Sequence, residues 1–188
     1  MSQSIMIRHA PYKVDWTELD RKELEKLLYH EKDPEVDKEK LNQQLDSRKL
    51  RTQEFTKIYT SPVKRAKQTA EKLSEILDVP VNEKEDLGEL KFSEVPEKIF
   101  EEGNEAVRQY LLDKTKQKNV DTDFLENIGE QKAVLVSHGF IMRKIHQELF
   151  ETEFSSLRDN QMFRNYLTGF SLEDGDAVSL KQELNTGK

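Results

Sequence analysis

An apolar run within the first ten residues constrains the fold more than any other stretch of the chain. Ile5-Met6-Ile7 is followed at once by Arg8-His9-Ala10. Three consecutive large apolar residues in a hydrophilic chain predict a short strand buried on both faces, which usually belongs to a parallel sheet. Ligands of open α/β sheets bind outside the carboxyl ends of the strands. Arg8 and His9 therefore lie at the end of the strand where a ligand is expected to bind.

The composition narrows the class of protein. Charged residues make up 36% of the 188 residues, and the net charge is -7. Such a chain lacks the basic character that nucleic acid or an anionic membrane would require, so we expect neither as a partner. No apolar stretch reaches the roughly 18 residues of a membrane span, and no signal peptide is recognisable. We expect one domain over residues 1–188, cytoplasmic and, since cysteine is absent, without disulfides or thiolate metal sites.

A second strand end brings another cation. Ile58-Tyr59-Thr60 predicts a short strand, and Ser61-Pro62 predicts a helix start with Ser as N-cap and Pro at the first helical position. Arg65 then falls in the first turn of that helix. From there its guanidinium can reach back over the carboxyl end of the strand.

A third strand end brings a second histidine. Residues 133–136, Ala-Val-Leu-Val, are the strongest buried strand in the chain and lead into Ser137-His138-Gly139. A helix is expected to follow, with Ile141, Ile145 and Leu149 on its buried face. His138 thus lies between a strand end and a helix N-terminus.

The remaining segments are expected to be mostly helical. One amphipathic helix starts at Thr17, and a second, vaguer one buries Leu41, Leu45 and Phe55; Asp33-Pro34 separates them. A helical pattern over 95–118 is interrupted by Gly103, which costs about 1 kcal/mol in a helix interior and leaves open one helix or two. The turn at 173–176 predicts a hairpin that adds an antiparallel edge.

Two kinds of site fit a cluster of two histidines and two arginines. Imidazole is the commonest protein ligand for zinc, which favours a metal site. Fixed positive charge opposes a divalent cation, however, and paired guanidiniums match the oxygens of a phosphate. We therefore expect phosphoryl chemistry without a metal ion or other cofactor. His30 and His146 lie within helical segments and are interpreted as surface or packing residues.

Four segments resemble the motifs of a known family. Arg8-His9-Ala10 resembles the Arg-His-Gly/Ala signature of the histidine phosphatase superfamily, in its phosphoglycerate mutase-like branch. Residues 59–70 are similar to the second signature nearly residue by residue, and residues 136–139 are similar to the third. Residues 87–94 resemble the segment that carries the acidic catalytic residue, which nominates Glu89.

The resemblance implies a fold and a set of roles. The fold would be an α/β three-layer sandwich with a mainly parallel sheet, helices on both faces and, with the hairpin, an antiparallel edge strand. His9 would attack phosphorus to give a phosphohistidine. Arg8, Arg65 and His138 would bind the phosphoryl group, with His138 also catalytic. Glu89 would protonate the leaving oxygen and then activate water.

Three departures from the family pattern concern regions that would contact the substrate. Pro11 replaces a residue that is often polar, Ser93 stands where glycine is usual, and one family pattern is not recognisable in residues 33–55. We interpret 11–56 and 93–131 as helical insertions near the pocket. The stretch between the acidic segment and the last signature is short for a mutase. We therefore favour a phosphatase that acts on a phosphorylated small molecule or a phosphoprotein.

Two alternatives stay open at this point. One is a phosphoglycerate-type mutase, and the other is a module that binds a phospholigand without turning it over. The substrate and the oligomeric state are not predicted.

Overall fold

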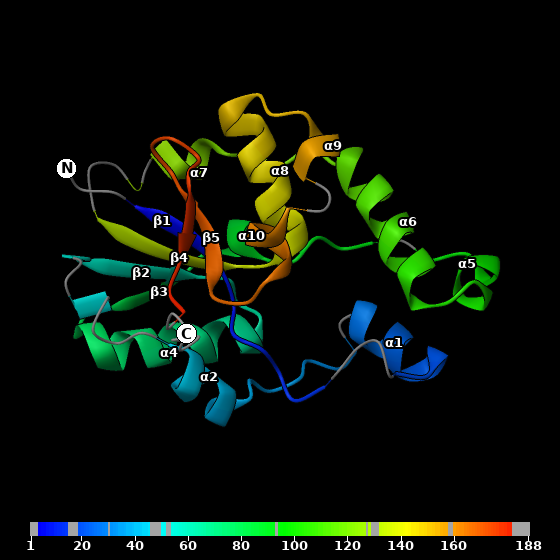
Figure 1. Cartoon of the computed structure of the whole chain (residues 1–188), viewed down its shortest axis with the longest axis horizontal. Helices are drawn as coiled ribbons and strands as arrows, with labels where there is room; N and C mark the ends of the chain where they lie inside the picture. The colour runs from blue at the N-terminus through cyan, green and yellow to red at the C-terminus, as the bar shows by residue number, and fades with distance from the viewer. Residues whose placement is uncertain are drawn as a thin grey trace, which may run out of the picture.

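The structure, a computed structural model, has one six-stranded sheet at its centre (Figure 1). It describes residues 4–14, 19–29, 31–45, 50–51, 54–92, 94–126, 128, 132–157 and 160–181. The sheet order is β3-β2-β4-β1-β5-β6. The strands are β1 (Ile5–Arg8), β2 (Lys57–Thr60), β3 (Val81–Glu83), β4 (Ala133–Ser137), β5 (Thr168–Ser171) and β6 (Ala177–Ser179).

The first strand lies in the interior of the sheet, as its apolar sequence predicts. β1 pairs in parallel with β4, with Ile5 opposite Val134, and antiparallel with β5, with Ile5 opposite Ser171. β2 pairs in parallel with both β3 and β4, so four neighbouring strands run in one direction. The predicted hairpin is the antiparallel pair β5–β6, with Gly175 at φ +76° in its turn. The carboxyl ends of β1, β2 and β4 therefore meet at one edge.

Helices cover both faces of this sheet, because side chains alternate along each strand. On β1, Ile5 and Ile7 pack toward one layer and Met6 toward the other. The first layer contains α2 (Lys38–Gln44) and α4 (Lys64–Leu77). The second contains α7 (Asp123–Glu126), α8 (Gly139–Phe150), α9 (Phe154–Leu157) and α10 (Gln161–Arg164). The expected α/β sandwich with an antiparallel edge is confirmed.

A further group of helices projects beyond the sheet, on the right of Figure 1. These cap helices are α1 (Arg21–Leu28), α5 (Glu97–Glu101) and α6 (Asn104–Lys116). They pack on one another through a separate apolar cluster around Leu24, Val107 and Leu111. Gly103 adopts φ +99° between α5 and α6, a conformation that favours glycine, so the interrupted pattern forms two helices.

Three sequence expectations about helices need correction or fall outside the described residues. Ser61 is not a helix N-cap: α4 begins at Lys64, and the Ser61 hydroxyl accepts a hydrogen bond from the Val63 N–H at 3.2 Å. Asp20 caps α1 by accepting from the Glu23 N–H at 2.9 Å, whereas the expected start at Thr17 lies outside the described residues. Leu149 is 37% exposed, since it lies near the end of α8, past the sheet.

Two other findings concern the sequence expectations. His146 packs against Phe150, Phe163 and Phe170, as a packing residue would, and His30 lies outside the described residues. Among the described helices, none combines the length and the apolar character that crossing a bilayer requires.

Candidate active site

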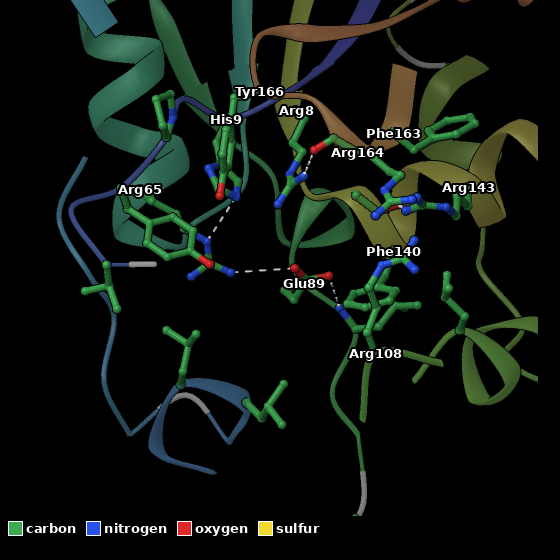
Figure 2. Close-up of a pocket in the computed structure, with 18 of the residues that line it drawn as sticks. Arg8, His9, Arg65, Glu89, Arg108, Phe140, Arg143, Phe163, Arg164 and Tyr166 are labelled. Carbon is green, nitrogen blue, oxygen red and sulfur yellow. Dashed lines mark hydrogen bonds and ion pairs between the residues drawn. The ribbon is translucent and has the colours of Figure 1, made fainter. Parts of the chain in front are cut away.

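A cavity of about 500 Å³ opens at the carboxyl ends of the central strands, between the sheet and the cap helices. Figure 2 shows the side chains that point into it. Its charged lining residues, within the described part of the chain, are Arg8, Lys13, Lys40, Arg65, Glu89, Glu105, Arg108, Arg143 and Arg164. Seven of these are cationic and two are acidic, in a protein whose net charge is -7. The cavity is thus a local basic site.

His9 follows β1 directly and is buried at 2% exposure. Its backbone N–H donates to the Ser137 carbonyl at 3.0 Å, which extends the pairing of β1 with β4. Nδ1 lies 2.7 Å from the Ala10 carbonyl oxygen, and because a carbonyl only accepts, Nδ1 is the nitrogen that carries the proton. Nε2 accepts from Arg65 Nε at 3.2 Å. Burial and the neighbouring charges of Arg65 and Arg8 lower the pKa of His9 well below its usual value, which favours the neutral ring.

Arg65 lies in the first turn of α4, as the sequence predicts, and three partners hold its guanidinium. Nε donates to His9, and Nη1 donates to Asp33 Oδ1 at 3.1 Å. Nη2 lies 3.6 Å from Glu89 Oε2. Asp33 also accepts from the Lys64 N–H at 2.6 Å, which fixes the carboxylate against the start of the helix. The sequence pattern predicts only that Asp33 ends a helix.

Glu89 comes after the short 3₁₀ helix η1 (Glu85–Leu87), and its carboxylate lies between two cationic or ionisable groups. Oε2 is 3.6 Å from Arg65 and 3.5 Å from His138 Nδ1. Ser137 holds this loop against β4 by donating its hydroxyl to the Leu87 carbonyl at 2.8 Å. Burial raises the pKa of Glu89, against the opposing effect of Arg65 and Arg8. Glu89, which the family resemblance nominates, thus lies beside two other candidate residues, Arg65 and His138.

His138 is fully buried where β4 passes into α8. Its Nε2 lies 2.8 Å from the Ser61 hydroxyl, which accounts for a serine that does not cap a helix. The His138 ring lies 5.1 Å from the His9 ring, centroid to centroid. The two histidines therefore face the same small volume, from adjacent parallel strands.

Arg8 completes the group that the sequence predicts. Its Nη1 donates to the main-chain carbonyl of Arg164, and its guanidinium lies over the Tyr166 ring, 4.3 Å from the centroid. Tyr12 and Tyr166 flank His9 at 5.9 and 5.6 Å between ring centroids. No sequence pattern singled out either tyrosine. We call the five predicted residues the sheet end of the cavity: Arg8, His9, Arg65, Glu89 and His138.

Three more arginines, which sequence reasoning missed, gather at the opposite side of the cavity (Figure 2). We call Arg108 on α6, Arg143 on α8 and Arg164 on α10 the helix end. Arg143 donates Nη1 to the Gly139 carbonyl at 2.6 Å and Nε to the Leu157 carbonyl at 3.1 Å. Burial, and then the charges of Arg8, Arg108 and Arg164, lower the pKa of Arg143 to about 9. The guanidiniums of Arg8, Arg108 and Arg164 therefore lie close enough to Arg143 to repel its charge.

This arrangement suits an anion with several oxygens better than a metal ion. Within the described part of the chain, His, Asp and Glu side chains nowhere converge in a group of three that could hold a metal. Guanidiniums instead converge on the neutral His9 ring, and these are the groups that pair with phosphate oxygens. The chemistry that the sheet end can perform is attack by an imidazole nitrogen on an electrophile of high negative charge.

Comparison with known proteins agrees with the motifs. Residues 5–123 match the model of the histidine phosphatase superfamily (branch 1). No curated protein matches the chain.

Solved structures with a similar fold include two phosphatases. A phosphoserine phosphatase from Entamoeba histolytica in complex with phosphoserine has a TM-score of 0.59 and 21% identity, over 99% of this chain and 98% of that one. A mycobacterial glucosyl-3-phosphoglycerate phosphatase in complex with inorganic phosphate has a TM-score of 0.56 and 14% identity, over 84% and 83%. Bacillus stearothermophilus YhfR has a TM-score of 0.54 and 15% identity, over 97% and 96%. At these identities the likeness concerns the fold.

Proposed function

Because the chain belongs to branch 1 of the histidine phosphatase superfamily, we propose that it hydrolyses a phosphomonoester, without a metal ion, through a phosphohistidine on His9. One observation carries the proposal. The proton of the His9 ring is held on Nδ1 by the Ala10 carbonyl, so Nε2 presents its lone pair toward Arg65 and the cavity. An imidazole in that tautomer is a nucleophile without any prior proton transfer.

The first step forms a bond from His9 Nε2 to phosphorus and breaks the bond from phosphorus to the ester oxygen. Arg8 and Arg65 offset the negative charge of the transferring group, with His138 beside them. Their positions are set by the fold before substrate binds: Arg65 by Asp33, Arg8 by the Arg164 carbonyl, and His138 by Ser61. Fixed charges of this kind stabilise the transition state without reorganisation.

Glu89 would serve as the acid and then as the base. Burial raises the pKa of its carboxyl group, which favours the protonated form needed to donate to the departing alkoxide. The resulting carboxylate would then accept a proton from the water that attacks the phosphohistidine. The bond from Nε2 to phosphorus breaks in that second step, and inorganic phosphate leaves with His9 restored.

Turnover of 4-nitrophenyl phosphate in the presence of EDTA tests this function. Wild-type protein is expected to release phosphate, whereas His9→Ala should lose activity by about 10⁴-fold or more, since no nucleophile remains. Equal turnover by the wild type and His9→Ala, or none by the wild type, would overturn the proposal.

A rapid-quench experiment tests the intermediate separately. Glu89→Gln cannot accept the water proton, so the phosphoenzyme should accumulate after a burst of 4-nitrophenol, a leaving group that needs little acid assistance. The bound phosphate should be labile in acid and stable in alkali, as expected for a nitrogen-phosphorus bond. Isomerisation that depends on a bisphosphate and exceeds hydrolysis would instead identify a mutase.

A further inference from the structure

Asp33 makes and breaks no bond in the proposed reaction, yet it contacts an arginine that serves the reacting groups. It lies in the loop between α1 and α2, within the segment where one family pattern is not recognisable. Its two carboxylate oxygens have different partners: Oδ1 accepts from Arg65 Nη1 at 3.1 Å, and Oδ2 accepts from the Lys64 N–H at 2.6 Å. One carboxylate thus joins the guanidinium to the backbone of the helix that carries it.

The contact with Lys64 anchors this carboxylate to the first turn of α4. Lys64 is the first residue of the helix, where backbone N–H groups have no partner within the helix. The preceding residue, Val63, makes no side-chain cap. Asp33 supplies the acceptor from 31 positions away, and its negative charge is favourable at a helix N-terminus. The position of the carboxylate therefore does not depend on Arg65 alone.

The loop that carries Asp33 is itself tied to two parts of the site. The Asp37 N–H donates to the Pro11 carbonyl at 2.9 Å, which joins the loop to the segment that follows β1. The Val36 N–H donates to the Gln68 side chain at 2.8 Å, which joins the loop to α4. These hydrogen bonds limit the positions that the Asp33 carboxylate can take.

Asp33 in turn fixes the direction of the other N–H groups of Arg65, because a guanidinium is planar and rigid. Nε of Arg65 donates to His9 Nε2 at 3.2 Å, and Nη2 lies 3.6 Å from Glu89 Oε2 (Figure 2). The second distance is longer than a hydrogen bond. Arg65 and Glu89 therefore do not form the pair with two parallel hydrogen bonds that arginine and carboxylate frequently adopt.

Without Asp33, the guanidinium would be free to turn toward Glu89, its second carboxylate partner. That turn would withdraw Nε from His9 and would give Glu89 two hydrogen bonds to a cation. Both effects work against the proposed reaction. The phosphoryl group at His9 needs the positive charge beside it, and a carboxylate stabilised in its charged form is a poor acid.

We propose that Asp33 is a positioning residue for the phosphoryl transfer: it holds Arg65 beside His9 and prevents Arg65 from pairing with Glu89 alone. Asp33 acts through Arg65 and touches no reacting atom. This inference deepens the proposed function and rests on it for turnover. Residues 33–37 thus support the reaction from outside the segments that the sequence motifs identify.

A double substitution tests this role. Asp33→Ala should lower kcat/KM for 4-nitrophenyl phosphate about tenfold or more, because Arg65 loses its fixed orientation. In an Arg65→Ala background the same substitution should change kcat/KM less than about twofold, since Asp33 acts only through Arg65. Glu35→Ala is the matched control. It removes a carboxylate of the same loop that pairs with Lys64 Nζ at 2.8 Å, and it should leave kcat/KM unchanged.

NMR titration of the His9 ring gives a second measurement, which does not need turnover. If Arg65 turns away in Asp33→Ala, His9 loses a neighbouring cation and its pKa should rise, in the same direction as in Arg65→Ala. Loss of the Asp33 charge by itself would lower the pKa of His9. The direction of the shift therefore separates positioning from a simple change of charge, and Glu35→Ala should show no rise.

The outcomes keep this inference apart from the proposed function. The same effect of Asp33→Ala on kcat/KM in both backgrounds, or a pKa of His9 that falls or stays the same, would overturn the positioning role and leave the phosphatase standing. If no ester turns over, the proposed function fails and the His9 titration still decides the role of Asp33. If Asp33→Ala does not fold, Asp33→Ser replaces it in both measurements, because its hydroxyl can accept from the Lys64 N–H but is too short to hold Arg65 as well.

Discussion

The two ends of the cavity are built in different ways. At the sheet end, every residue except Glu89 lies at or just after a strand or in the first turn of a helix. Backbone or buried side-chain partners fix the two histidines: His9 by Ala10, His138 by Ser61. At the helix end, Arg108, Arg143 and Arg164 come from the sides or ends of helices. The sheet end is thus suited to holding a catalytic geometry fixed. The side chains of the helix end can be substituted without disturbing the sheet.

Among the substitutions that compare the two ends, Arg65→Ala is expected to have the largest effect, because Arg65 serves every substrate alike. Arg65→Ala should lower kcat/KM by about 10²–10³-fold for aryl and alkyl esters, the usual cost of losing one stabilising group. Removing that charge should also raise the pKa of His9, which NMR titration of the ring can follow. An equally large loss in Arg164→Gln, at the helix end, would mean that the two ends are not separate.

Glu89 is expected to have the next largest effect, and its size should depend on the leaving group. Glu89→Gln should lower kcat/KM for alkyl esters by about 10²-fold and for aryl esters less, since kcat/KM reports the step in which the leaving group departs and alkoxides need the proton more. In the wild type, kcat/KM for alkyl esters should fall as the pH rises through the raised pKa of Glu89. That descending limb should vanish in Glu89→Gln; its persistence would assign the acid to another group.

The pH dependence of stability can be compared for two histidines, His9 at the sheet end and His146 beside the helix end. His9 and His146 are both buried, and burial lowers both pKa values from the usual 6.5. The unfolded chain therefore binds more protons as the pH falls through 6.5, so the folded state loses stability on the acid side. His146 packs on Phe163, next to Arg164, and so reports on the helix end.

Thermal unfolding at pH 7.5 and pH 5 measures these contributions. The drop in Tm between the two pH values should be smaller in His146→Leu than in the wild type, and smaller in His9→Gln as well. An undiminished drop in His146→Leu would show that the pKa of His146 is the same in the folded and the unfolded protein.

The smallest effect is expected from Glu105. In its ion pair with the buried Arg108, the Glu105 side chain is 74% exposed, and pairs screened by solvent contribute about 1 kcal/mol or less. Glu105→Gln should therefore lower the free energy of unfolding, measured by urea denaturation, by no more than that amount. The same substitution should leave turnover of 4-nitrophenyl phosphate as it is. A loss of turnover would show that this pair at the helix end supports the sheet end.

The sequence predicts the sheet end far better than the helix end. Arg8, His9 and His138 follow apolar runs, and the carboxyl ends of parallel strands meet at one edge. Arg65 comes from a strand-turn-helix pattern, although the capping role given to Ser61 was wrong. Glu89 has no such local signal and was found through the family resemblance alone.

The residues missed by sequence reasoning share a physical reason. Arg108, Arg143 and Arg164 are three of 30 Lys and Arg residues, and periodicity on a helix does not separate a cavity-lining cation from a solvated one. Asp33 likewise looks like a residue that ends a helix, and its contact with Arg65 spans 32 positions. Such contacts depend on tertiary packing, which a local pattern does not specify.

The separate apolar cluster of the cap helices has a consequence for local unfolding. Since α1, α5 and α6 share this cluster, to which α8 adds Phe140, rather than the two that cover the sheet, we expect them to open as a unit at lower free energy than the sheet itself. Amide hydrogens of α6 should then exchange with solvent faster than those of β4. A ligand that spans both ends would have to hold this unit closed, so its binding should slow exchange in α6 more than inorganic phosphate does.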